Sequence, residues 1–140
     1  MRAYVAGKTH DFERVREVQA LVRRAGYEIT HDWTVEVERN GPNIGGSPDE
    51  RVSVEERKRY AELDRDGVID ANCVVVVTGH ENLVGTLIEV GIAVSTLKPV
   101  FVLGRFPRYS IFWELDNFTF CDDEEALKGC LGQLEMELNS

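Results

Sequence analysis

Short apolar runs alternate with longer amphipathic stretches along the chain, and this alternation predicts the secondary structure. Residues 2–6, apolar after Arg2, end at a glycine and predict a short strand. Over residues 11–25 apolar side chains recur three and four positions apart, which predicts a helix, and residues 27–30 predict a second strand. Residues 73–78 are a continuous, mostly β-branched run, typical of a strand buried on both faces of a parallel sheet.

Caps and periodicity mark the remaining elements. Ser53 and Glu56 form a capping box that starts a helix running to about Asn72. We expect a further helix over 84–96, strands over 99–103 and 118–121, and a last helix that Asp122 caps together with Glu125. Residues 39–50 are rich in turn formers and predict a flexible loop.

This order of elements favours one fold class. Strands that alternate with helices form βαβ units, which build a parallel sheet covered by helices on both faces. We therefore predict an α/β protein, a single domain over residues 1–140 with a doubly wound, mainly parallel five-stranded sheet of the Rossmann or flavodoxin-like type. In such sheets ligands bind beyond the carboxyl ends of the strands, so functional residues are expected at that edge.

The charge balance limits the partners. The 140 residues include 25 acidic and 16 basic side chains, a formal net charge of −9. Residues 114–140 hold 8 of the acidic and 1 of the basic side chains, so most of the net charge belongs to the C-terminal segment. The long-range field repels a nucleic-acid polymer and an anionic membrane surface, whereas one small anion in a local pocket is compatible with it.

The sequence predicts no membrane span, secretion signal, metal or cofactor. No apolar run approaches the ~20 residues that cross a bilayer, and the apolar start is too soon broken for a signal peptide. The three cysteines, Cys73, Cys121 and Cys130, have no metal-ligand spacing, and the three histidines are scattered. We expect reduced core thiols in a cytoplasmic protein.

Two carboxylates stand where a charge is costly. Glu89 lies in the helix over 84–96, which is apolar nearly all round and is therefore expected to be buried. On the preceding helix, Asp64 shares with Tyr60 and Val68 the face expected to meet the core. Two such carboxylates at one end of a sheet can form an acid/base or nucleophile pair. The alternatives are a subunit contact or a path to solvent for Glu89, and partial exposure for Asp64.

Three other features have both a structural and a functional interpretation. Tyr4, on the first strand, is either a core residue or a phenol that orients a carboxylate. Gly7, Lys8 and Thr9 link that strand to a helix N-terminus and could hold a ribose or one phosphate. A Walker loop is excluded, because it needs a glycine at position 2, which is arginine. Trp33 is either core or a stacking platform for a planar base.

Six stretches of the chain follow a shared pattern. They are Tyr-Val-Ala-Gly at 4–7, Gly-Tyr-Glu-Ile-Thr-His-Asp-Trp at 26–33, Leu-Asp-Arg-Asp-Gly-Val-Ile at 63–69, Ala-Asn-Cys-Val-Val at 71–75, Gly-Thr-Leu-Ile-Glu-Val-Gly-Ile-Ala at 85–93 and Lys-Pro-Val at 98–100. In this order they resemble the nucleoside 2-deoxyribosyltransferase family and its relatives, the 2'-deoxynucleoside 5'-phosphate N-hydrolases. The stretch at 85–93 is the most specific. Asn72 departs from the pattern, because the family has an acid there.

The resemblance implies a role for individual residues. Glu89 matches the nucleophile that attacks C1' of a 2'-deoxyribosyl group and forms a glycosyl-enzyme. Asp64 matches the carboxylate that helps protonate the leaving base, and Tyr4 matches the tyrosine that orients the nucleophile. The expected substrate-binding residues are Gly7, Lys8, Thr9, Trp33, Gly85 and Thr86. No metal and no cofactor are implied.

Three functions follow as hypotheses. The first is transfer of deoxyribose from a 2'-deoxynucleoside to an acceptor base. The second is hydrolysis of a 2'-deoxynucleoside 5'-monophosphate, with water in place of the base, and the third is a non-catalytic nucleotide-binding module on the same sheet. The partner is in each case a small deoxynucleoside or deoxynucleotide. Because the family's sites are usually completed across subunits, the resemblance also implies a homodimer or higher homo-oligomer.

Overall fold

The fold is built on a parallel five-stranded sheet with strand order β2-β1-β3-β4-β5. A computed structural model describes residues 1–45, 52–79 and 84–140. The strands are β1 (Arg2–Ala6), β2 (Glu28–Ile29), β3 (Cys73–Val77), β4 (Val100–Leu103) and β5 (Phe118–Cys121). The helices are α1 (Phe12–Arg24), α2 (Thr34–Asn40), α3 (Val54–Asp70), α4 (Val84–Ser95) and α5 (Glu124–Asn139). The predicted doubly wound α/β class is confirmed.

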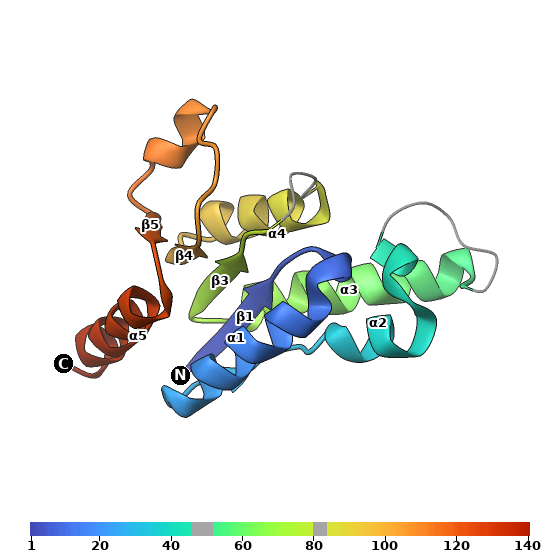
Figure 1. The fold of residues 1–140 in the computed structure, drawn as a ribbon, viewed down its shortest axis with the longest axis horizontal. Helices are drawn as coiled ribbons and strands as arrows, with labels where there is room; N and C mark the ends of the chain where they lie inside the picture. The colour runs from blue at the N-terminus through green and yellow to red at the C-terminus, as the bar shows by residue number, and fades with distance from the viewer. Residues whose placement is uncertain (46–51, 80–83) are drawn as a thin grey trace.

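The helices form a layer on each side of the sheet (Figure 1). α1 contacts α5 in one layer, and α3 contacts α4 in the other. An ion pair of 2.7 Å between Arg14 of α1 and Glu124 of α5 links the helices of one layer. The chain changes direction across the sheet between β1 and β3, because β1 pairs with β2 on one side and β3 on the other. Ligands of such folds bind at this switch point.

The core lies around β1 and β3. Every residue of β3 is buried, and so are residues 3–6 of β1. This agrees with the continuous apolar run over 73–78, because a central parallel strand is covered on both faces. Among the described residues, no helix is long and apolar enough to cross a membrane.

Four local expectations need correction or completion. α2 was not predicted, and α5 is capped by Asp123 rather than Asp122, since Asp123 Oδ1 accepts from the Ala126 amide at 2.8 Å. The predicted loop over 39–50 begins as the end of α2 and continues as the 3-10 helix η2 (Pro42–Gly45), while 46–50 lies outside the described residues. The capping box holds, because the Ser53 hydroxyl accepts from the Glu56 amide at 3.1 Å.

The expectation that α4 is buried all round is wrong for the single chain. Thr86, Val90 and Ala93 face the core, but Val84 and Ile88 are about two-thirds exposed. The helix packs on β3, β4 and α3, while Val84, Leu87 and Ile88 stay exposed. An apolar surface that reaches water in this way marks a contact surface in many proteins.

Candidate active site

The Tyr4 side chain stands at the centre of the candidate site. It is fully buried on β1 under α3, and its hydroxyl makes no well-formed hydrogen bond to any described residue. Gly67 of α3 permits this packing: a Cβ there would lie 3.0 Å from the Tyr4 ring and 2.9 Å from Cβ of His31. A glycine inside a helix costs about 1 kcal/mol relative to alanine, so the close approach explains its presence.

Glu89 and Asp64 approach the Tyr4 hydroxyl from two helices. Glu89 lies in the second turn of α4, with its Oε2 buried and unpaired among the described residues, and Asp64 lies on α3 with its Oδ1 in the same state. Burial, followed by the charges of both carboxylates, raises the pKa of Tyr4 well above its usual value. The structure therefore brings together the three residues predicted to be catalytic, around one buried phenol.

The environment favours the protonated form of both carboxyls. Burial raises the pKa of Glu89 to about 8, with the charge of Asp64 acting in the same direction and the Tyr4 hydroxyl opposing it. Burial also raises the pKa of Asp64 to about 6. Because each charge disfavours the other, the pair titrates as one unit, and near neutral pH it shares a proton. Two close carboxyls with one proton can combine nucleophilic and acid chemistry.

Two more titratable side chains adjoin Asp64, and the sequence analysis did not select them. His31 Nε2 lies 3.5 Å from Asp64 Oδ1 and 3.2 Å from Glu36 Oε1. His31 follows β2 and Glu36 belongs to α2, and both side chains are largely buried. The sequence signal for α2, the helix that carries Glu36, is Asp32 two residues before its start at Thr34: Asp32 Oδ1 accepts from the Thr34 amide at 3.1 Å.

The first loop places Gly7, Lys8 and Thr9 between β1 and η1 (Thr9–Asp11). Gly7 is required by packing, because a Cβ there would lie 2.6 Å from a methyl group of Val15. The Thr9 hydroxyl donates to the Pro42 carbonyl at 2.5 Å, which fastens η2 to this loop. Lys8 is half-buried. The loop lies at the carboxyl end of β1, where a substrate contact remains a prediction.

Trp33 is placed in the core. It is 7% exposed, and its indole N–H donates to the Val5 carbonyl at 2.8 Å. This geometry fits the structural interpretation of Trp33, and contact with a base stays a prediction. The adjoining Asp32 also accepts from the side chain of Gln19 at 3.0 Å, so this corner fixes α2 against β1 and α1.

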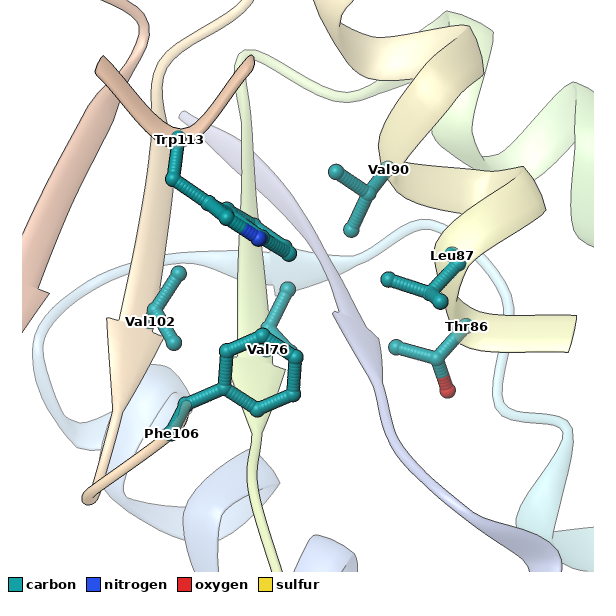
Figure 2. A pocket seen from close by; sticks show the side chains of 7 residues that line it. All are labelled: Val76, Thr86, Leu87, Val90, Val102, Phe106 and Trp113. Atoms are coloured by element: carbon teal, nitrogen blue, oxygen red, sulfur yellow. The ribbon is translucent and has the colours of Figure 1, made fainter. Parts of the chain in front are cut away.

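At the start of α4, Gly85 faces open space and Thr86 faces the core. Nothing lies within 4 Å of a Cβ built at Gly85, which leaves open space beside the helix. Thr86 is buried and borders an apolar pocket with Leu87, Val90 and residues of β3, β4 and the segment after β4 (Figure 2). Trp113 and Phe106 close this pocket, their rings 4.9 Å apart in an edge-to-face arrangement. It has no room for a substrate and forms part of the packing.

The described residues contain no group of three or more His, Cys, Asp or Glu side chains that could hold a metal ion. The three cysteines are thiols, two buried and one half-buried. The Sγ atoms of Cys121 and Cys130 lie 3.7 Å apart. Burial raises the pKa of Cys73 to about 12, so this thiol stays protonated in the core.

Comparison with solved structures identifies the fold. A CMP N-glycosidase from Clostridium botulinum superposes with a TM-score of 0.58 over 94% of this chain and 98% of its own, at 17% identity. A 2-deoxyribosyltransferase from Bacillus psychrosaccharolyticus superposes with a TM-score of 0.69 over 94% and 96%, at 16% identity. The chain has the fold of these two enzymes. The resemblance inferred from the sequence is thereby confirmed at the level of fold.

These two enzymes process nucleosides or nucleotides, as their names state. At 16–17% identity the likeness establishes fold and leaves the reaction open. No protein-family model matches the sequence, and no curated protein matches it.

Proposed function

We propose that the protein cleaves the N-glycosidic bond of a 2'-deoxynucleoside and transfers the deoxyribosyl group to an acceptor base. The observation that carries this proposal is the convergence of Glu89 and Asp64 on the buried Tyr4 hydroxyl. Leaving a buried oxygen of each carboxyl, Glu89 Oε2 and Asp64 Oδ1, without a partner is costly unless it has a compensating role, although the Asp64 side chain is 33% exposed. A carboxyl pair that shares a proton suits glycosidic chemistry. The fold of the two nucleoside-processing enzymes supports the same conclusion.

The reaction runs in two balanced steps. In the first, the Glu89 carboxylate attacks C1', the C1'–N bond breaks, and the leaving base takes the proton from Asp64. In the second, a nitrogen of the acceptor base attacks C1', the C1'–O bond to Glu89 breaks, and the acceptor's proton returns to Asp64. A transition state with oxocarbenium character forms more readily without a 2'-hydroxyl, which favours a deoxyribose substrate.

The position of the shared proton decides whether the site is active. The productive form has Glu89 ionised and Asp64 protonated. In the free protein the pKa of Glu89 (about 8) exceeds that of Asp64 (about 6), so the proton lies mainly on Glu89 and the productive form is the minor one. The Tyr4 hydroxyl lowers the pKa of both Glu89 and Asp64 against the effect of burial, so it favours the ionised form of whichever carboxyl it contacts. We assign Tyr4 the role of orienting the nucleophile.

Substrate contacts are proposed at the edge of the sheet around this cluster. Gly7, Lys8 and Thr9 would hold the sugar or a 5'-phosphate, since backbone amides and a lysine at a strand–helix junction suit an anion. Gly85 and Thr86 would border the sugar from α4. Trp33 would contact the base only at the edge of its ring, because the indole is buried.

The second candidate function is hydrolysis of a nucleoside 5'-monophosphate with the same nucleophile and water as the acceptor. The specific observation in its favour is the fold shared with a CMP N-glycosidase over 94% of the chain. In this variant water attacks C1' of the intermediate, the C1'–O bond to Glu89 breaks, one proton of the water passes to Asp64, and the sugar leaves as a 5-phosphate. A binding module without catalysis is the third possibility.

One incubation series separates these functions. Deoxyinosine, dIMP, dCMP and CMP are each supplied with and without free adenine, and products are followed by chromatography. Transferase activity gives a new deoxyadenosine only when adenine is present. Hydrolase activity gives free base and sugar 5-phosphate without adenine. No product from any substrate would overturn both proposals and favour the binding module.

The nucleophile is tested by substitution and by trapping. Glu89→Gln is expected to lose turnover by at least about a thousandfold while retaining substrate binding, since a neutral amide does not attack C1'. The matched control is Glu38→Gln, because Glu38 is an exposed α2 residue paired with Arg16 at 2.7 Å. A 2-fluoro-2-deoxyribosyl substrate should leave an adduct on the peptide that contains Glu89. An adduct elsewhere, or a fully active Glu89→Gln, would refute the assignment.

We further propose a homodimer in which a second copy covers the exposed face of α4. Val84, Leu87 and Ile88 supply the apolar surface, and an uncovered apolar face on a helix that carries the nucleophile is costly in water. Sedimentation should show a dimer that Ile88→Glu converts to a monomer. A wild-type monomer at high concentration would refute the proposed dimer.

The three free thiols support a reducing, cytoplasmic setting for the protein.

A further inference from the structure

His31 and Glu36 form a charge pair beside Asp64, and the proposed reaction steps do not use it. The three side chains come from three elements: the segment after β2, α2 and α3. His31 Nε2 lies between two carboxyl oxygens, 3.2 Å from Glu36 Oε1 and 3.5 Å from Asp64 Oδ1. Nε2 of His31 and Oε2 of Glu36 are buried and have no hydrogen-bond partner among the described residues. A structural ion pair would leave fewer buried polar atoms unsatisfied.

Hydrogen bonds of Asp32 and Trp33 fix the turn that carries His31 and the start of α2, the helix of Glu36. Asp32 accepts hydrogen bonds from the Thr34 amide and the Gln19 side chain, which fixes the start of α2. The Trp33 indole N–H donates to the Val5 carbonyl and fastens the same turn to β1. Glu36 is therefore carried toward the site by a firmly packed short helix, although the Glu38 side chain two residues later is mostly exposed.

We propose that His31 and Glu36 are positioning residues for Asp64, and that their opposite charges decide which of the two site carboxyls carries the shared proton. This inference rests on the proposed function for its catalytic meaning. The Glu36 carboxylate raises the pKa of Asp64 toward that of Glu89, so it increases the fraction of the protein in which Asp64 holds the shared proton. Without Glu36, His31 would lower the pKa of Asp64 further and leave the proton on Glu89.

The directions of the electrostatic effects on Asp64 agree with this proposal. Burial is the largest cause of its raised pKa of about 6, the charge of His31 lowers that pKa, and Glu36 raises it. The Tyr4 hydroxyl of β1 also lowers the pKa of Asp64, and the charge of Asp64 in turn raises the pKa of Glu89 on α4. His31 and Glu36 therefore have opposite effects on one carboxyl, and this opposition is testable.

The experiment titrates the Asp64 carboxyl in the free protein. The protein is labelled with ¹³C at the aspartate carboxyl carbons, and the Asp64 signal is assigned by its loss in Asp64→Asn. Titrations are run on wild type, Glu36→Gln, His31→Gln and the double variant, with Glu38→Gln as the matched control on the same helix. Thermal melts show that each variant is folded, and His31→Asn replaces His31→Gln if the latter is not.

Glu36→Gln should lower the pKa of Asp64 and His31→Gln should raise it, each by about one pH unit. The double variant should fall between the two, and Glu38→Gln should not move it. A loss of packing alone would not give opposite signs or restoration in the double variant. Shifts in the same direction, or no shift in either single variant, would overturn the proposal.

Turnover supplies a second readout. The alkaline limb of kcat/KM should move to lower pH in Glu36→Gln and to higher pH in His31→Gln, because protonated Asp64 is the required form. Alkaline limbs that do not move while the Asp64 titration does would overturn the catalytic meaning. If even the wild-type protein turns over no substrate, the proposed function fails, while the carboxyl titration still decides the electrostatic inference.

Discussion

Replacing Gly67 by alanine tests whether the close packing of α3 on Tyr4 is required. Two effects of opposite sign compete at this position. Alanine favours a helix interior by about 1 kcal/mol over glycine. The added methyl group would however lie 2.9 Å from Cβ of His31 and 3.0 Å from the Tyr4 ring, closer than such atoms normally approach.

The balance follows from what can move. The Tyr4 ring is fully buried on a central strand, so neither it nor α3 can shift freely. Overpacking in a core of this kind costs about 1–3 kcal/mol, which exceeds or cancels the helical gain. Subtracting the helical gain of about 1 kcal/mol from the overpacking cost leaves a net loss for Gly67→Ala of between about 0 and 2 kcal/mol of stability. For 140 residues, 1 kcal/mol corresponds to roughly 3 °C in Tm.

Gly129→Ala is the matched control, because a Cβ at this position of α5 meets nothing within 4 Å. It should gain about 1 kcal/mol and melt roughly 3 °C higher than wild type. Differential scanning calorimetry measures both variants. Displacing Tyr4 or His31 should also reduce turnover about tenfold or more in Gly67→Ala, since small misplacements are costly in catalysis. If Gly67→Ala gained as much stability as the control and kept full turnover, the packing argument would be wrong.

Two further predictions concern the acids of the site and its support. The pKa of Glu89 is about 8 in the folded protein and about 4.5 in the unfolded chain. Between these pH values the folded state therefore binds one proton more than the unfolded state. The contribution of Glu89 to stability is highest below about pH 4.5 and declines as the pH rises toward 8. Glu89→Gln should therefore melt higher than wild type at pH 8.5 but close to it at pH 4, and equal differences at both pH values would contradict this sign. Asp32→Ala should destabilise the fold by about 1–2 kcal/mol in urea titrations, because it leaves the Thr34 amide and the Gln19 side chain without their acceptor. A loss of under about 0.3 kcal/mol would show that the start of α2 is held by other contacts.

The strands and long helices could be predicted because their physical signals are local. β3 is a continuous β-branched run, and α3 begins at a capping box that the structure reproduces. α2 escaped prediction because Thr34–Asn40 alternates valine with glutamate and resembles an exposed strand as much as a helix. Asp32, two residues before the helix, becomes informative only when α1 supplies Gln19 as a second donor, which is a tertiary contact.

The same reason explains the part of the site that was missed. Glu89 and Asp64 stand out in the sequence because each is a charge on an apolar face. Glu36 does not, since its neighbours Glu38 and Arg39 make the segment look solvated. Only the turn after β2 directs Glu36 toward His31, and nothing local in the sequence encodes that direction. The α4 surface was mispredicted because an apolar sequence does not specify which chain covers it.

The pairing of β1 with β3 has a consequence for folding during synthesis. β1 is synthesised before β3, which pairs with it through four residues and ends only at Val77. Its other neighbour, β2, pairs with it through two residues. Non-local parallel pairing of this kind delays the formation of the sheet. A nascent chain that stops before β3 therefore exposes one edge of an apolar strand to chaperones and proteases. Tyr4 is synthesised before the two helices that carry Asp64 and Glu89, so the site forms only after α4 has been made.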